Sequence, residues 1–511
     1  MDNKINNNSK NNNISSMASI PKRIFRGSSA VFAGKTGVYL AGFIFTPVLV
    51  RLIGKEGYGI YGTLISVYYI VKTISILGLQ DSIRKHIAQY GNKKGSSNEI
   101  ASFSIILAII LGILIALVGG LIIFVLYKIG TFELKTFNYL LILLTVLIIN
   151  NSLEAFVSTL YGIYKEGKVS TLRILQKLAF YFLAIAFVLL DFWIIGVLLG
   201  LLIAEIITTF SSYLFVKKHI KVSFYSAKIG FQQYGKKIVS FGVFTLIGIF
   251  SATLLMQVDI LIVQNFEGNA ITGAYKAAHI AAEMILFIPP ILQLVMLTNC
   301  TELWHQNRKQ ELIDISSKIW KYNFLILSLL SIGLVVLAKP FVNFYFGEGF
   351  NETTILLILL IPGCFFFGLS RIINPIIVGS GWVIHSTILA VFVATLNIGL
   401  NFMLVPRYGA IGAAIGTSIS YFLFFIFYLV LLKLRRLNLL KELLLGRFTL
   451  LIIVFGGLFY YINLIWPFSD ISKLFVTPII GIILFVLLAN SFSILYLKEL
   501  KIRVKQIINA F

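Results

Sequence analysis

The sequence is poor in charge and in cysteine. Only 12% of its 511 residues are charged, whereas 58% are hydrophobic. An apolar excess of this size cannot be hidden inside one water-soluble globule. The two cysteines, Cys300 and Cys364, lie far apart and without metal-ligand spacing. This spacing excludes a disulfide framework and a paired-cysteine zinc site.

The motifs of nucleotide and hydrolytic chemistry are also missing. Gly34-Lys35-Thr36 resembles the end of a phosphate-binding loop, but Ser29 stands where that loop needs its first glycine. The chain contains no HExxH and no GxSxG pattern. An ATPase or hydrolase therefore has no support in the spacing, and we expect neither a cofactor nor a metal nor an enzymatic activity.

Long apolar stretches are abundant instead. Segments of roughly 20 residues, enough to cross a hydrocarbon core about 30 Å thick, recur from Ser28 to Leu497. The sequence thus predicts an all-α integral membrane protein of about 14 transmembrane helices. Their ranges are 28–53, 58–83, 98–127, 137–163, 169–190, 192–216, 238–265, 270–298, 320–345, 353–379, 382–405, 410–433, 446–466 and 473–497.

Positive charge exceeds negative charge, with 43 Lys and Arg against 20 Asp and Glu. In a soluble protein this excess would indicate nucleic acid as a partner. Here the basic residues crowd every second loop, as the positive-inside rule requires, and no nucleic acid is expected. The pattern predicts a multi-pass protein of the plasma (cytoplasmic) membrane with both termini in the cytoplasm.

Two halves of the chain resemble each other at an offset of about 215 residues. Segment 195–200 matches 411–416, segment 57–61 matches 271–275, and segment 160–162 matches 377–379. Duplicated halves that surround a central site are common in transporters. We therefore predict a disordered cytoplasmic tail at 1–27, an N-lobe of six helices at 28–216, a C-lobe of six helices at 238–433, two further helices at 446–497 and a cytoplasmic tail at 498–511.

Basic residues inside the predicted helices are the main candidates for a binding site. A Lys or Arg at the bilayer centre costs at least about 2.5 to 3.5 kcal/mol, so it usually faces a wet cavity or a partner. We interpret these residues as donors to phosphate oxygens in a gap between the lobes. The candidates are Lys35, Lys72, Lys276, Arg371 and Arg84. Internal ion pairs or snorkelling are the alternatives, and for Arg84 a local ion pair with Asp81 is favoured.

Four acidic residues, Glu154, Glu205, Asp259 and Glu283, also fall inside predicted helices. Asp259 and Glu283 begin the second lobe, where they are candidates to bind a coupling cation or to neutralise Lys276. The adjacent Pro289 and Pro290, and the single prolines Pro362 and Pro375, indicate helix breaks or kinks. The mixture of tryptophan, aliphatic and charged residues in 301–322 predicts a helix on the inner membrane surface.

Two segments carry a resemblance to a known family. Thr46-Pro47-Val-Leu-Val-Arg51-Leu-Ile-Gly54 runs into Tyr58-Gly-Ile-Tyr61, and Val405-Pro406-Arg407-Tyr408-Gly409 runs into Gly412-Ala-Ala-Ile-Gly416-Thr417. In these segments the chain resembles the oligosaccharide flippase or polysaccharide biosynthesis protein family, the Wzx-like branch of the MOP exporter superfamily.

That resemblance implies two lobes, alternating access and a lipid-linked oligosaccharide as cargo, carried on polyprenyl phosphate or pyrophosphate. It also implies membrane lipids as surroundings and a glycan polymerase or glycosyltransferases as pathway partners. Lys35, Lys72 and Lys276 would suit the cationic cavity of such proteins.

Two other functions remain open at this point. A MATE-like, cation-coupled exporter of small organic molecules would favour acidic over basic residues in its cavity. A membrane glycan polymerase or transferase would carry a sizeable extramembrane loop with catalytic residues, whereas the predicted outer loops are short.

Overall fold

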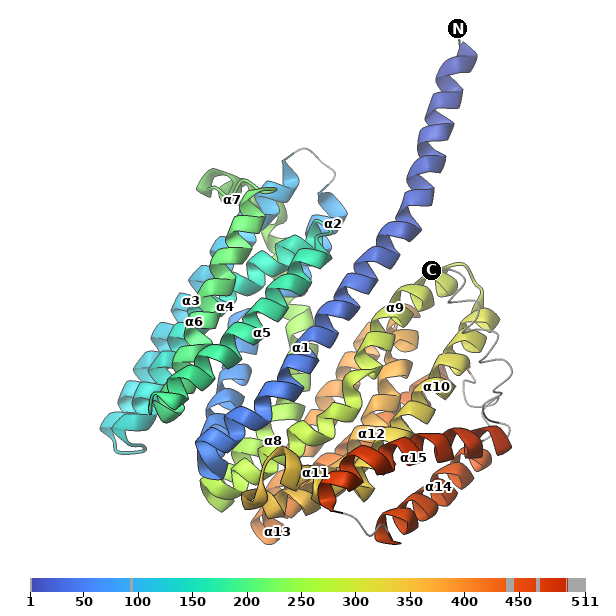
Figure 1. Ribbon diagram of the computed structural model, residues 1–511. Helices are drawn as coiled ribbons and strands as arrows, with labels where there is room; N and C mark the ends of the chain where they lie inside the picture. The colour runs from blue at the N-terminus through green and yellow to red at the C-terminus, as the bar shows by residue number, and fades with distance from the viewer. Residues whose placement is uncertain (1, 92–94, 438–444, 466–468, 493, 495–511) are drawn as a thin grey trace. The chain divides into compact units, whose positions relative to one another are not determined.

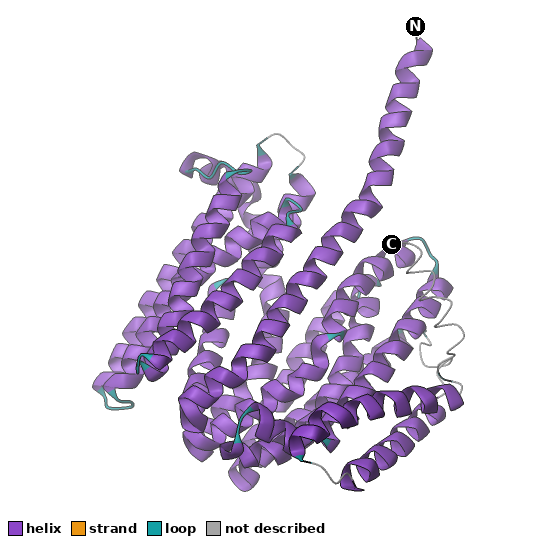
Figure 2. Ribbon diagram, in the orientation of Figure 1, coloured by secondary structure: helices purple, strands orange, loops and turns teal. Residues whose placement is uncertain are grey.

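The computed structural model describes residues 2–91, 95–437, 445–465, 469–492 and 494, and side chains from residue 29 onward except at 298, 445, 470 and 471. In these ranges the chain is mostly helical, with short turns and loops between the helices, and they contain no strand (Figures 1 and 2). The main helices are α1 Asp2–Ser75, α2 Leu79–Tyr90, α3 Ser96–Lys128, α4 Leu134–Gly162, α5 Glu166–Leu189, α6 Trp193–Lys217, α7 Phe224–Gly230, α8 Lys236–Glu283, α9 Pro289–His305, α10 Lys309–Val336, α11 Ala338–Tyr345, α12 Asn351–Gly379, α13 Val383–Leu434, α14 Leu445–Ile465 and α15 Asp470–Ser491.

Eleven helical segments of the described chain are long and apolar enough to cross a membrane. Three of them, at 29–75, 224–287 and 383–434, have 47, 64 and 52 residues. At 1.5 Å per residue these are roughly 70 to 95 Å long, more than twice the thickness of the hydrocarbon core. Each must therefore hold two crossings, which gives 14 for the described residues. The predicted fold class is confirmed.

Left-handed glycines divide these three long segments. Gly54 has φ 73° and ψ 174°, Gly268 has φ 74° and ψ −174°, and Gly409 has φ 57°. Nothing lies within 4 Å of a Cβ built on Gly54 or Gly268, so glycine is needed there for its backbone freedom and not for space. Gly54 and Gly268 share one conformation at the offset of the sequence repeat. The duplication is thus visible in the backbone.

The chain forms two compact units, Met1–Gln257 (unit 1) and Val258–Phe511 (unit 2). Within unit 1, α3, α4, α5 and α6 lie side by side (Figure 1). The division falls inside α8, because the first part of this helix bonds to unit 1. The Ser82 hydroxyl donates to the Ile238 carbonyl at 2.7 Å, and the Ser66 hydroxyl donates to Gln257 Oε1 at 2.9 Å. The predicted lobe limits stay a prediction.

Close packing in both units depends on small residues. A Cβ on Gly200 would lie 2.6 Å from the Ala184 backbone nitrogen, where α6 crosses α5. In unit 2, a Cβ on Gly363 would lie 2.5 Å from the Cα of Ser418, where α12 crosses α13. Backbones approach this closely in lipid because van der Waals packing drives helix association there. These crossings fix the rotation of the helices that carry the polar side chains described below.

The structure contradicts some local predictions and confirms one. Segment 301–322 is not a separate surface helix: α9 ends at His305 and α10 begins at Lys309. Its apolar residues serve helix packing, since Trp320 is fully buried and its ring lies 5.3 Å from that of Phe324. A break at Pro289 is present, with a 3₁₀ turn at Met284–Phe287 before α9. In contrast, α12 runs through Pro362 and Pro375 as one helix.

The two predicted tails remain predictions. α1 extends back to Asp2, through the segment for which the composition predicts disorder. The predicted tail 498–511 lies outside the described residues.

Candidate functional site

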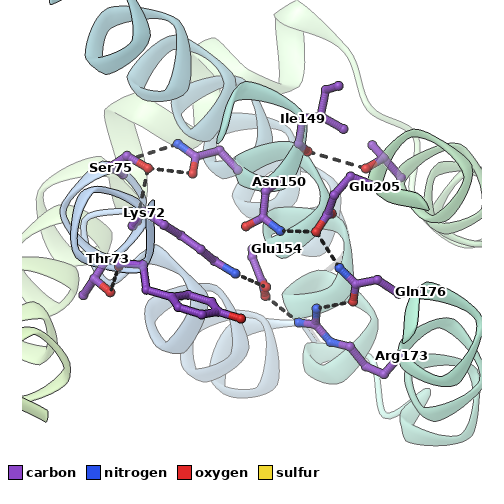
Figure 3. A network of polar contacts seen from close by, with 12 residues as sticks. Lys72, Thr73, Ser75, Ile149, Asn150, Glu154, Arg173, Gln176 and Glu205 are labelled. Carbon is purple, nitrogen blue, oxygen red and sulfur yellow. Dashed lines mark hydrogen bonds and ion pairs between the residues drawn. The ribbon is translucent and has the colours of Figure 1, made fainter. Parts of the chain in front are cut away.

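Six polar side chains from four helices meet inside unit 1, and we call them the unit 1 polar network (Figure 3). All lie within segments apolar enough to span a membrane. The members are Lys72 of α1, Asn150 and Glu154 of α4, Arg173 and Gln176 of α5, and Glu205 of α6.

Glu154 is the centre of charge in this network. Its Oε1 lies 3.4 Å from Lys72 Nζ, and its Oε2 lies 2.6 Å from Arg173 Nη2. The carboxylate is only 6% exposed, so its charge depends on these partners. One carboxylate therefore serves two cations, and the group of three has a net positive charge.

Amide side chains extend the network to α6. Arg173 Nη1 donates to Gln176 Oε1 at 3.1 Å, and Gln176 Nε2 donates to Glu205 Oε1 at 2.8 Å. Asn150 Nδ2 donates to the same Glu205 oxygen at 3.1 Å. Glu205 is 3% exposed. A continuous chain of polar contacts thus connects α1, through α4 and α5, with α6 (Figure 3).

A neighbouring asparagine fixes the end of α1 that carries Lys72. The Ser75 hydroxyl donates to Asn151 Oδ1 at 2.8 Å, while Asn151 Nδ2 lies within hydrogen-bond distance of the Ser75 and Ala108 carbonyls, at 3.3 Å each. Immediately after Ser75 the helix ends, and Leu77 and Gly78 both have positive φ. Lys72 is therefore held on the last turn of α1, facing α4.

Both cations keep some accessible surface. The side chain of Lys72 is 21% exposed and that of Arg173 is 27% exposed. An ammonium has three N–H donors and a guanidinium has five, more than Glu154 and Gln176 use. The remaining donors can bind the oxygens of a phosphate or carboxylate.

Sequence reasoning missed Arg173 as a site residue, although this residue lies inside the predicted helix 169–190. Lys177 lies one turn further along α5, with its Nζ 4.9 Å from the centroid of the Tyr181 ring. Tyr181 in turn shares a 2.7 Å hydrogen bond with Thr46 of α1. The four-residue spacing of Arg173 and Lys177 places both on one helix face, a signal that the sequence carries.

Unit 2 contains a second buried polar group, centred on Asp259. Tyr275 and Thr417 donate hydroxyl hydrogen bonds to its Oδ2 at 2.6 and 3.3 Å, and the Ile260 amide donates to its Oδ1 at 2.8 Å. Asp259 is fully buried. His279 Nε2 lies 4.0 Å from Asp259, and His279 Nδ1 lies 3.7 Å from Glu283.

Two asparagines lie beside this aspartate group. Asn397 Nδ2 donates to the Thr417 and Ser420 hydroxyl oxygens at 3.4 and 3.3 Å. The Oδ1 atoms of Asn397 and Asn401 are buried and have no hydrogen-bond partner among the described residues. Where side chains are described, no cluster of three or more His, Cys, Asp or Glu is suited to a metal ion.

The other predicted site residues are distributed as follows. Arg84 forms an ion pair with Asp81 at 3.5 Å, which is the alternative to a binding role that the sequence favours for this residue. Its guanidinium lies 4.4 Å from the Tyr161 ring centroid. Arg371 donates to Gln293 at 3.3 Å and lies over the Phe367 ring.

Two lysines complete the predicted set. Lys276 is buried in unit 2, where it interacts electrostatically with Glu283 and Asp259. Lys35 is half-buried on the first part of α1 and is not a member of the unit 1 polar network. The structure brings Lys72 together with Glu154, and Asp259 with Glu283 through His279. A common chamber for Lys35, Lys72 and Lys276 involves both units and stays a prediction.

The chain has the fold of solved transporters of the MOP superfamily. The chain is similar to the lipid II flippase MurJ, with a TM-score of 0.65 and 16% identity over 93% of this chain and 99% of that one. It is also similar to an inward-facing multidrug resistance MATE family transporter, with a TM-score of 0.63 and 17% identity over 81% of this chain and 96% of that one. A MOP superfamily transporter from Pyrococcus furiosus has a TM-score of 0.61 and 18% identity over 82% of this chain and 97% of that one.

The particular family follows from the sequence. A model of the polysaccharide biosynthesis protein family matches residues 24–299, and the chain belongs to this family. An uncharacterized membrane protein of Methanocaldococcus jannaschii is 24% identical over 441 residues, which cover 82% of this chain and 86% of that protein. The predicted resemblance is confirmed.

Proposed function

We propose that the protein is a flippase that moves a lipid-linked oligosaccharide across the plasma membrane by alternating access, without enzymatic activity of its own. Membership of the polysaccharide biosynthesis family supports the class of cargo. The observation that carries the proposal is the pair of cations, Lys72 and Arg173, that share the single carboxylate of Glu154. Such a group attracts an anion into an otherwise apolar protein.

The phosphate or pyrophosphate of the cargo would bind at this cation pair. Arg173 offers a planar set of donors that fits two phosphate oxygens, and Lys72 offers a compact charge beside it. The polyprenyl tail stays in the bilayer while the sugars pass through the protein. An inside-negative potential contributes about 2.3 kcal/mol per charge per 100 mV toward moving the anion outward.

Asp259 is the proposed site of a coupling cation, with Glu283 nearby. Its carboxylate accepts a hydrogen bond from the Thr417 hydroxyl, to which Asn397 also donates. Asn401 donates to the Asn397 carbonyl, and the amide oxygens of both asparagines are unpartnered among the described residues. Carboxylate, hydroxyl and amide oxygens are the ligands that hard cations prefer. An inward cation bound here would add to the driving force.

The test uses purified protein in liposomes that contain a radiolabelled polyprenyl-pyrophosphate oligosaccharide. Transport is measured as the time course with which the sugars become accessible to a glycosidase added outside. We expect rapid exposure with the wild type, slow exposure with Lys72→Ala, and wild-type rates with Lys135→Ala, which removes an exposed lysine at the start of α4. If the sugars become accessible to the glycosidase no faster than in liposomes without protein, the proposal is contradicted. A cation-dependent efflux of organic dyes would favour the MATE-like alternative.

A further inference from the structure

Glu205 is a buried acid of the unit 1 polar network, and its two oxygen atoms differ in how they are hydrogen-bonded. Asn150 Nδ2 donates to Glu205 Oε1 at 3.1 Å. The other oxygen of each group, Glu205 Oε2 and Asn150 Oδ1, is buried and has no partner among the described residues. Two acceptor atoms are therefore unsatisfied on two side chains that already touch.

Protonation removes the charge from this group. An ionised carboxylate has only acceptors, whereas a protonated one has an O–H donor. Both cations of the network, Lys72 and Arg173, pair with Glu154. The described hydrogen bonds of Glu205 come instead from the neutral amides of Asn150 and Gln176. A buried charge without a cation of its own costs more than the neutral acid.

We propose that Glu205 is a proton-binding site of the transport cycle, in which the protonated acid pairs with Asn150 and the proton sets the net charge of the unit 1 polar network. The proton is taken from solvent and released to it as H⁺, with no other reactant. The inference goes beyond the cation site at Asp259, which lies in unit 2.

The titratable groups around Glu205 determine what its proton does. The helices packed against α6 are α1, α4 and α5. They present Lys72 and Tyr68 from α1, Glu154 from α4 and Arg173 from α5. With neutral Glu205, two cations face one carboxylate and the network has one positive charge in excess. When Glu205 loses its proton, the charges balance.

Proton binding and anion binding are therefore coupled. An anion binds better to a network that keeps its excess positive charge, so the protonated form is the one that receives it. Linkage requires that the bound anion strengthens proton binding by the same factor. This step rests on the proposed function, whereas the proton site itself does not.

The internal repeat has no acid at the equivalent place of unit 2. The glycine pair 196 and 200 corresponds to 412 and 416, which aligns Glu205 with Tyr421. Segment 160–162 corresponds to 377–379, which aligns Asn150 with Phe367. In unit 2 these two aromatic rings stack at 4.4 Å. The same contact between equivalent helices is thus apolar in one unit and an acid with an amide in the other.

Infrared difference spectroscopy of the purified protein in detergent tests the proton site directly. We expect a protonated carboxylic acid band in the wild type that shifts in D₂O, is absent in Glu205→Gln and is unchanged in Glu133→Gln, a matched control at an exposed loop position. In Asn150→Ala the band should persist at higher frequency, because the carbonyl oxygen of the acid has lost the hydrogen bond donated by Asn150 Nδ2. A spectrum of folded Glu205→Gln identical to the wild type overturns the proposal. If that variant does not fold, an unshifted band in Asn150→Ala overturns it.

Binding of farnesyl pyrophosphate, measured by titration between pH 5.5 and 8.5, tests the coupling. The wild type should bind at least several-fold more tightly at the acidic end, and Glu205→Gln should bind tightly at every pH. Equal pH dependence in both proteins overturns the proposed coupling. If the infrared band behaves as expected but the probe does not bind, the proton site is supported and the proposed cargo fails. If the probe binds but the infrared band is absent, the proposed cargo is supported and the proposed proton site is wrong.

Discussion

The Arg173 guanidinium donates a 2.6 Å hydrogen bond to Glu154, although both residues lie in helices apolar enough to cross a membrane. Lys72 reaches the other oxygen of the same carboxylate. An ion pair inside a membrane protein often serves only to neutralise its two members. Here the second cation prevents full neutralisation, so pairing of Lys72 is compatible with a role in binding an anion.

Replacing Glu154 should destabilise the protein. Glu154→Ala leaves two cations without their shared partner, and we expect a loss on the order of 2 kcal/mol, below the 3 to 5 kcal/mol typical of fully buried pairs because both cations keep some solvent contact. The measurement is the unfolding temperature in detergent. A double-mutant cycle with Arg173→Met should give a coupling energy above about 0.5 kcal/mol. Strict additivity of the two changes would show that the contact does not contribute to stability.

Replacing Lys72 should affect transport more than stability. Lys72→Ala leaves the Arg173–Glu154 bond in place, so we expect an unfolding temperature close to that of the wild type. Sugar exposure in the liposome assay should fall at least tenfold, because the anion loses one of its two cations. Lys135→Ala serves as the control. Normal transport by Lys72→Ala would remove this residue from the mechanism.

The number of crossings and the interruptions at 54–57, 266–269 and 406–409, where the glycine breaks lie, could be predicted from the sequence because both depend on local patterns. Hydropathy shows each apolar stretch, and the repeat aligns Gly54 with Gly268. The salt bridges could not be predicted, since Lys72, Glu154 and Arg173 lie 82 and 19 residues apart in sequence. Their meeting depends on how each helix is rotated, which the close helix crossings fix. Segment 301–322 was misinterpreted because a surface helix and two adjoining helix ends have the same mixed composition.

Alanine at the two equivalent glycines should cost similar amounts of stability. Gly54→Ala and Gly268→Ala force a Cβ onto a backbone with positive φ and ψ near 180° at open positions, a conformation essentially confined to glycine, which costs about 1 to 3 kcal/mol. Gly399→Ala is the matched control, because this glycine has helical geometry and equally open surroundings. That change should be neutral or stabilising, by up to about 1 kcal/mol. Unfolding temperatures of the three variants decide the matter, and a loss in Gly399→Ala equal to the others would refute the backbone explanation.

His86 should make the protein sensitive to acid. This residue of α2 lies outside the candidate membrane spans, and burial lowers its pKa below the usual 6.5, assisted by Lys85 and Lys237 and opposed by a hydrogen bond to the Ser82 carbonyl. A histidine that is neutral when folded takes up its proton more readily when unfolded. Its contribution to stability is therefore complete above pH 6.5 and is lost as the pH falls through the lower folded value.

The variant His86→Gln isolates this contribution. Between pH 7 and pH 5 the unfolding temperature of the wild type should fall more steeply than that of His86→Gln, which has no proton to gain. The control is His219→Gln, at an exposed histidine for which the wild-type slope should remain. Parallel pH profiles for His86→Gln and the wild type would contradict the interpretation.

Sodium should stabilise the protein if Asp259 binds a coupling cation. A ligand that binds only the folded state raises the unfolding temperature with its concentration, and a tenfold excess over its dissociation constant contributes about 1.4 kcal/mol. We expect sodium chloride to raise the unfolding temperature of the wild type above the value in choline chloride at equal ionic strength. Asp259→Asn should abolish this difference, and Thr417→Val should reduce it, since its hydroxyl lies 3.3 Å from the carboxylate. A sodium effect that survives in Asp259→Asn would place the cation elsewhere, and a potassium or lithium effect of the same size would show that the site does not select its ion.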